Sequence, residues 1–170
     1  MDDPLAHVTN AKISLLEEVR LQAEVLVPLL KAFRAELGEE RANQIASATL
    51  RDWARNIFHK IGAQLPGSPK EKWAALSAAL IPRIGNAVDF EMLKQEPDAV
   101  EFNITGCRYA DFFRQLGEPE LGALLLCEMD VHMAEVIGGS EVELTRTQTI
   151  MKGAKYCDFR YRLKTGAASE

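Results

Sequence analysis

The sequence has few cysteines, no excess of positive charge and no long hydrophobic run. Its three cysteines, Cys107, Cys127 and Cys157, are far apart in the chain, so we expect reduced thiols and neither a disulfide framework nor a CxxC-type zinc site. The formal net charge of -5 argues against nucleic acid as a partner, because a nucleic-acid surface requires a basic stripe. No apolar run is long enough to span a bilayer, and the first residues lack the basic patch and apolar core of a leader, so we expect a cytoplasmic protein without a membrane partner.

The composition is that of an ordinary globular protein, with 47% hydrophobic and 26% charged residues. A chain of 170 residues is long enough to bury a substantial core but short for two full domains. We therefore expect a single domain over residues 1–170. A helical half at about 9–82 is followed by an α+β half at about 88–163.

The first half shows helical periodicity in three segments, at about 9–37, 39–61 and 69–82. Pro28 should bend the first helix, Gly38 and Gly62 should end the first two, and Ser68 with Glu71 forms a capping box before the third. Apolar residues at three- and four-residue steps form a seam on the first helix; these are Leu16, Val19, Ala23, Leu26, Leu30, Phe33 and Leu37. Such a seam usually packs on the core, and a homodimer contact through this N-terminal helix is the alternative.

The core candidates of the second and third helices are mostly aromatic and branched aliphatic residues. They are Ala42, Ile45, Ala46, Trp53 and Ile57 in the second helix, and Trp73 and Leu76 in the third.

The second half alternates extended and helical segments. A hairpin at about 90–94 and 100–105 precedes a short helix at about 108–116 and a longer helix at about 118–137. A terminal hairpin pairs residues 142–151 with 156–163 across a turn at 152–155. This order predicts an α+β fold, in which an antiparallel sheet of about four strands from two hairpins packs with the helices.

The terminal hairpin carries unusually polar residues for a structural sheet. Because side chains alternate across a strand, Cys157 and Tyr161 share one face, whereas Asp158 and Arg160 share the other. The first strand of the hairpin also mixes polar residues, including Arg146, with hydroxyls. Two interpretations remain open: these residues form a solvated face with charge pairs, or one polar set lines an internal pocket.

The helix at about 118–137 carries two clusters of residues that could take part in catalysis or bind a metal. Cys127 and Asp130 share one face, and a carboxylate there would need a partner such as Arg146 or Arg160. Glu128, His132 and Glu135 form another cluster, which could bind a metal but is more simply a surface ladder of salt bridges. We therefore predict neither a metal site nor any other cofactor.

Four motifs in one order resemble a known family. They are Phe-Asn-Ile-Thr-x-Cys-Arg-Tyr-Ala-x-Phe-Phe from residue 102, Leu-Gly-x-Pro-Glu-Leu-Gly from 116, Cys-x-x-Asp from 127, and Arg-Thr-Gln-Thr-Ile-Met-x-Gly-Ala-x-x-Cys-Asp-Phe-Arg-Tyr from 146. Together they resemble the L-2-amino-thiazoline-4-carboxylic acid hydrolase family over about residues 99–163. The first half resembles the family only as a helical segment around residues 36–42.

The resemblance implies a small-molecule substrate and the hydrolytic opening of a cyclic amidine or isothiourea. The model reaction converts L-2-amino-thiazoline-4-carboxylate to N-carbamoyl-L-cysteine. The alternative is a non-catalytic small-molecule sensor with the same fold.

The residue types near the motifs suit such chemistry. Asp130 and Asp158 are candidates for a general base that becomes an acid toward the departing sulfur, and Cys157 or Cys127 could instead be a nucleophile. The expected substrate-binding residues are polar or ionisable and lie in or beside the motifs: Arg146, Arg160, Cys107, Tyr109 and Thr147.

Overall fold

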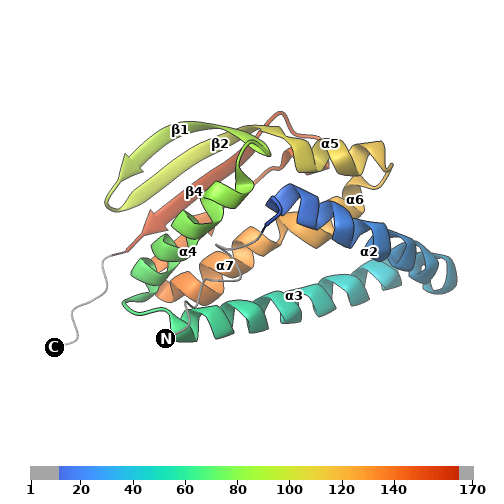
Figure 1. Ribbon diagram of the computed structural model, residues 1–170, viewed down its shortest axis with the longest axis horizontal. Coiled ribbons are helices and arrows are strands. Elements are labelled where there is room, and N and C mark those ends of the chain that lie inside the picture. The colour runs from blue at the N-terminus through green and yellow to red at the C-terminus, as the bar shows by residue number, and fades with distance from the viewer. Residues whose placement is uncertain (1–11, 165–170) are drawn as a thin grey trace.

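The computed structural model describes residues 12–164, and it begins with three helices (Figure 1). These are α2 (Leu15–Leu37), α3 (Glu39–Gln64) and α4 (Pro69–Ile84). The side chains of Ser14 and Ser68 accept hydrogen bonds from the N–H groups at the starts of α2 and α4, so both helices begin with a capping box. The expected start of the first helix near Thr9 lies outside the described residues. Pro28 lies inside α2, as expected.

The buried face of α3 differs from the predicted one. Trp53 is 50% exposed and Ile45 is also exposed, whereas the buried residues are Ala42, Ala46, Ala54, Phe58 and Ile61. A face rich in alanine allows neighbouring helices to approach closely, and this gain in packing outweighs the burial of the larger indole. Gly62 does not end α3, which continues to Gln64. A Cβ at Gly62 would lie 3.0 Å from Cδ1 of Ile137, so this position packs closely against α7.

The second half supplies the sheet and the remaining helices. In chain order these are β1 (Val88–Glu96), β2 (Ala99–Cys107), α5 (Arg108–Gln115), α6 (Pro119–Gly122), the π-helix η1 (Ala123–Cys127), α7 (Met129–Gly138), the 3-10 helix η2 (Gly139–Glu141), β3 (Val142–Thr145), the 3-10 helix η3 (Ile150–Lys152) and β4 (Cys157–Leu163). The four strands pair antiparallel in the order β1-β2-β4-β3. The predicted α+β fold with a four-stranded antiparallel sheet is therefore confirmed.

Two predicted elements are interrupted. The helix expected at about 118–137 is divided by the π-helix η1. The strand expected at about 142–151 ends at Thr145, because side chains of β4 replace its backbone partners: the Asp158 carboxylate accepts hydrogen bonds from the N–H groups of Thr147 and Gln148, and the Cys157 sulfur accepts one from Ile150.

The helices lie on one side of the sheet, with α7 between the sheet and α3 (Figure 1). The inward face of β4 is buried, whereas Asp158, Arg160 and Arg162 lie on its other face and are partly or fully exposed. Both arginines lie 3.8 Å from Glu101 of β2, so this outer face carries the charge pairs expected of a solvated sheet surface. Elements from both halves of the chain contribute to one hydrophobic core, whose largest fully buried side chains are those of Leu76, Phe113 and Leu121.

The seam of α2 is only partly buried. Ala23, Val27 and Leu30 face the core, but an apolar row at four-residue steps is exposed along the helix: Leu21, Val25, Leu29, Phe33 and Leu37. No helix within residues 12–164 has the length and hydrophobicity needed to cross a membrane.

Candidate functional site

An ion pair joins α7 to the segment that follows β3. The Oδ2 atom of Asp130 lies 2.6 Å from Nη1 of Arg146, and Nη2 of the same arginine donates a hydrogen bond to the carbonyl of Cys127, where η1 ends. The guanidinium also lies over the Phe159 ring, with Cζ 5.1 Å from its centroid. Arg146 is the partner that Asp130 was predicted to need, and it turns toward the helices because the chain leaves the sheet at this residue.

The two members of the pair differ in exposure. The Arg146 side chain is only 9% exposed, whereas the Asp130 side chain is 43% exposed. Desolvation by the surrounding protein nevertheless raises the pKa of Asp130, and Arg146 opposes this rise.

All three thiols gather around this pair. Cys107 ends β2, Cys127 ends η1 and Cys157 begins β4, and each is close enough to influence the ionisation of another. Desolvation raises the pKa of every one of them, and that of Cys127 reaches about 12. The sulfurs of Cys107 and Cys157 accept hydrogen bonds from the N–H groups of Ala110 and Ile150, at 3.4 and 3.2 Å. The raised pKa values favour the protonated form of these thiols at neutral pH.

Two buried tyrosines complete the surroundings of the pair. Burial raises the pKa of Tyr109 to about 12, and its hydroxyl has no hydrogen-bond partner among the described residues. Burial also raises the pKa of Tyr161, to which the nearby Asp130 charge contributes. Sequence reasoning did not assign Tyr161 to the site. Cys157, Phe159 and Tyr161 follow one another at two-residue steps along β4, and this alternation was a signal that Tyr161 faces inward.

The structure does not bring Asp158, Thr147 or Arg160 to this site. Asp158 is held by the Thr147 hydroxyl at 2.7 Å and by two backbone N–H groups, which outweigh desolvation and lower the pKa of its carboxyl. Arg160 donates hydrogen bonds to the carbonyl of Phe102 and the side chain of Asn103, both at 2.8 Å. These residues therefore stabilise the sheet and its outer face.

Comparisons with known proteins agree with the motifs. The sequence model of the L-2-amino-thiazoline-4-carboxylic acid hydrolase family matches residues 18–161. The chain belongs to this family. The match extends from α2 to β4, so it covers the helical half as well as the segment at 99–163 that carries the motifs.

Other comparisons are more distant. No curated protein matches this family member. A similar solved structure is the phenol-responsive sensory domain of the transcription activator PoxR, determined with phenol. The two are 15% identical with a TM-score of 0.46, over 81% of this chain and 72% of that one.

The cluster on the longer helix does not form a metal site in the structure. Within the described part of this hydrolase-family chain, no group of three or more His, Cys, Asp or Glu residues could hold a metal ion. Glu135 pairs with Arg55 at 3.0 Å, and Glu128 accepts a hydrogen bond from Ser47 at 3.3 Å, as in the expected ladder of polar contacts. Within the cluster, Nδ1 of His132 lies 3.6 Å from Oε2 of Glu135, as the ladder predicts, but His132 is buried and so is not on the expected surface.

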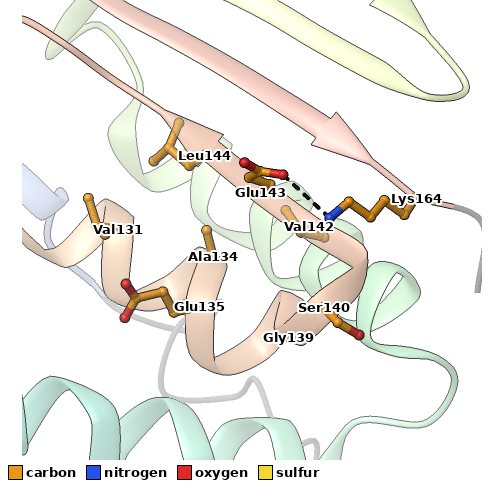
Figure 2. Close-up of a pocket in the computed structure, with 9 residues that line it drawn as sticks. All are labelled: Val131, Ala134, Glu135, Gly139, Ser140, Val142, Glu143, Leu144 and Lys164. Carbon is orange, nitrogen blue, oxygen red and sulfur yellow. Dashed lines mark ion pairs between the residues drawn. The ribbon is translucent and has the colours of Figure 1, made fainter.

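The two surface depressions that stand out lie away from the Asp130–Arg146 pair. One, of about 330 Å³, lies between α7 and β3, and Figure 2 shows the ion pair of Glu143 and Lys164 at its rim. The other, of about 570 Å³, lies between α3 and η1. Neither is lined by a cysteine or by either member of the Asp130–Arg146 pair.

Proposed function

We propose that this chain hydrolyses a small cyclic amidine or isothiourea, as in the conversion of L-2-amino-thiazoline-4-carboxylate to N-carbamoyl-L-cysteine. The observation that carries the proposal is the Asp130–Arg146 ion pair, in which Oδ2 lies 2.6 Å from Nη1 and desolvation raises the pKa of the carboxyl. Membership of the hydrolase family supports the same reaction class.

In the proposed reaction Asp130 acts first as a general base and then as a general acid. Its carboxylate accepts a proton from water while the water oxygen bonds to the amidine carbon of the ring. The carbon–sulfur bond then breaks, and Asp130 returns the proton to the departing sulfur. One water molecule is consumed, and the product carries a free thiol and a urea group.

Arg146 is best described as a positioning residue. Both of its Nη atoms are already engaged, one by Asp130 and one by the Cys127 carbonyl, and its guanidinium is 9% exposed. These contacts orient the carboxylate, and the guanidinium charge opposes the rise in the carboxyl pKa that desolvation causes. The sequence-based idea that Arg146 binds the substrate carboxylate is therefore less well supported than this orienting role.

The raised thiol pKa values favour water over cysteine as the nucleophile. A thiol with a pKa of about 12, such as that of Cys127, contains very little thiolate at pH 7. No nearby cation overcomes this effect at Cys157, where desolvation outweighs Arg146. The cysteines instead supply a weakly polar wall around the carboxylate.

The second candidate is a small-molecule-binding domain of the same fold without catalysis. Such a sensor would retain affinity for its ligand when Asp130 is replaced by asparagine, and it would not convert the ligand. The two candidates thus differ in turnover rather than in the location of the site.

A hydrolysis assay tests the proposal directly. Purified protein is incubated with a panel of cyclic amidines and isothioureas, including L-2-amino-thiazoline-4-carboxylate, with and without a chelator, and products are identified by mass spectrometry. We expect ring opening that is insensitive to the chelator and that is lost in Asp130→Asn. Binding of panel members without any turnover would refute the hydrolase and leave the sensor.

A further inference from the structure

The guanidinium of Arg146 makes contacts of two different kinds. Its Nη1 atom donates a hydrogen bond to the carboxylate of Asp130 at 2.6 Å, and its Nη2 atom donates one to the carbonyl of Cys127. The group also lies over the ring of Phe159, with Cζ 5.1 Å from the ring centroid. The hydrogen bonds act on the two Nη atoms, whereas the attraction of the ring acts on the charged group as a whole. The ring therefore limits a movement of the guanidinium that the hydrogen bonds leave open.

Phe159 is itself held in the sheet by its neighbours. It is 8% exposed and lies on the buried face of β4, opposite Phe102 of β2. The rings of Phe102 and Phe159 stack with their centroids 4.9 Å apart and their planes at 10°, and the Tyr161 ring lies 6.3 Å from that of Phe159. Cross-strand neighbours of this kind stabilise each other's position, so the ring is a fixed support.

Arg146 needs such a support because of its place in the chain. It follows the last residue of β3, Thr145, and therefore lies in an irregular segment. Its side chain is only 9% exposed, and a contact between a cation and a ring is stronger where both are removed from water. Since Arg146 opposes the rise in the Asp130 pKa that desolvation causes, any movement of the guanidinium away from the carboxylate would raise that pKa further.

We infer that Phe159 is a positioning residue, whose ring holds the guanidinium of Arg146 against the carboxylate of Asp130. This inference rests on the proposed function, because it gives the ring a part in hydrolysis at Asp130. Phe159 lies within the last of the four family motifs, but sequence reasoning gave it no role in the site. It acts through Arg146 and not on the substrate.

A graded series of fluorinated phenylalanines in place of Phe159 tests the ring directly. One, two or three fluorine atoms weaken the negative face of the ring stepwise and change its size little, so the packing is kept. In the ligand-free protein, the pKa of Asp130 is measured by NMR of the carboxyl carbon, which Asp130→Asn assigns, and it should rise with each fluorine. Over the same series kcat for ring opening should fall by about two- to thirtyfold, and KM should change less. An Asp130 pKa that is the same throughout the series would overturn the inference.

The chain offers a matched control for each part of this test. Arg20 lies over the ring of Phe112, with Cζ 5.6 Å from its centroid, so the same series at Phe112 weakens a similar contact elsewhere and should alter neither the Asp130 titration nor kcat. Phe159→Leu and Phe113→Leu remove buried rings, so both should lower the melting temperature, but only Phe159→Leu should shift the titration of Asp130. Phe159→Tyr keeps the face of the ring, and its Asp130 should titrate as in the wild type.

The outcomes separate this inference from the proposed function. If the Asp130 pKa rises along the series but no cyclic amidine or isothiourea is hydrolysed, the support of Arg146 by Phe159 stands and the hydrolase is wrong. If hydrolysis depends on Asp130 but its pKa and kcat are the same for every fluorinated form, the hydrolase stands and the positioning role is wrong. A lower melting temperature of Phe159→Leu with an unshifted Asp130 titration would show that the ring only packs in the core.

Discussion

Replacing Asp130 with asparagine separates the chemical role of this carboxylate from its structural role. The substitution keeps the size of the side chain and one oxygen that can accept from Arg146, but it removes the basic group. Positioned general acid–base groups contribute about 10²–10⁴-fold to a rate, so kcat should fall by about that factor. The substrate affinity should change much less, because asparagine keeps the size of the side chain and its contact with Arg146.

The cost in stability can be derived from the geometry of the pair. A hydrogen bond to a charged group contributes about 1.5–3 kcal/mol to the free energy of unfolding. Because the Asp130 side chain is 43% exposed, we expect the substitution to lower that free energy by a smaller amount, about 1–2 kcal/mol. For a domain of this size each kcal/mol shifts the melting temperature by about 2–4 °C, so the variant should melt about 2–8 °C lower and remain folded at 25 °C. A lower kcat of Asp130→Asn at that temperature therefore reflects the loss of the catalytic group and not unfolding.

The assay measures ring opening across a range of pH for the wild type, Asp130→Asn and the exposed control Asp52→Asn. A general base must be deprotonated, and the pKa of Asp130 is raised above 3.8, so the wild-type rate should decline on the acidic side at a higher pH than for an ordinary aspartate. That acidic limb should vanish in Asp130→Asn and persist in Asp52→Asn. Asp130→Asn protein that is folded and retains a kcat within threefold of the wild type would refute the reasoning.

Four other outcomes follow from the structure. Iodoacetamide at pH 7.5 should alkylate Cys127 in the native protein far more slowly than a free thiol, because its pKa is about 12; rapid labelling by mass spectrometry would contradict this. The pKa of Asp158 is lower in the folded protein than its ordinary value of 3.8, so the ionised carboxylate stabilises the fold above that pH, and this stabilisation is lost as the pH falls through the folded-state pKa. The free energy of unfolding of Asp158→Asn, measured by urea titration, should therefore depend less on pH below about pH 4 than that of the wild type. Gly122→Ala would place a Cβ 2.5 Å from Cγ of Phe113 and should cost about 1–3 kcal/mol, so an unchanged urea midpoint would argue against this packing. The homodimer contact that is the alternative role of the N-terminal helix remains a prediction. If the dimer forms, Val25→Glu, in the exposed row of α2, should dissociate it in sedimentation experiments; a monomeric wild type would exclude it.

Local patterns were sufficient where neighbouring residues control the structure. The capping box at Ser68 and the hairpin before Cys107 depend on interactions only a few residues apart, and both occur as predicted. The placement of Cys157 and Asp158 on opposite faces of a strand follows from backbone geometry alone, and the structure has it. These patterns could not show which face of that strand would be buried, because both faces of the terminal hairpin carry polar side chains.

Interactions between distant segments decided the rest. The first strand of the terminal hairpin ends early because Asp158 and Cys157 take the place of its backbone partners, and this exchange depends on contacts across the sheet. Trp53 is exposed although it is apolar, because the alanine face of α3 packs more closely on its neighbours.

The sequence by itself determined the order of the elements, the α+β class and the family, since these follow from short-range propensity and from motifs in a fixed order. Only the tertiary structure decided that Arg146 rather than Arg160 pairs with Asp130, and that Trp73 and Tyr109 have unpaired donors in the interior. The physical reason is that desolvation and hydrogen-bond satisfaction depend on every group packed around an atom. In this protein those groups come from helices and strands far apart in the chain.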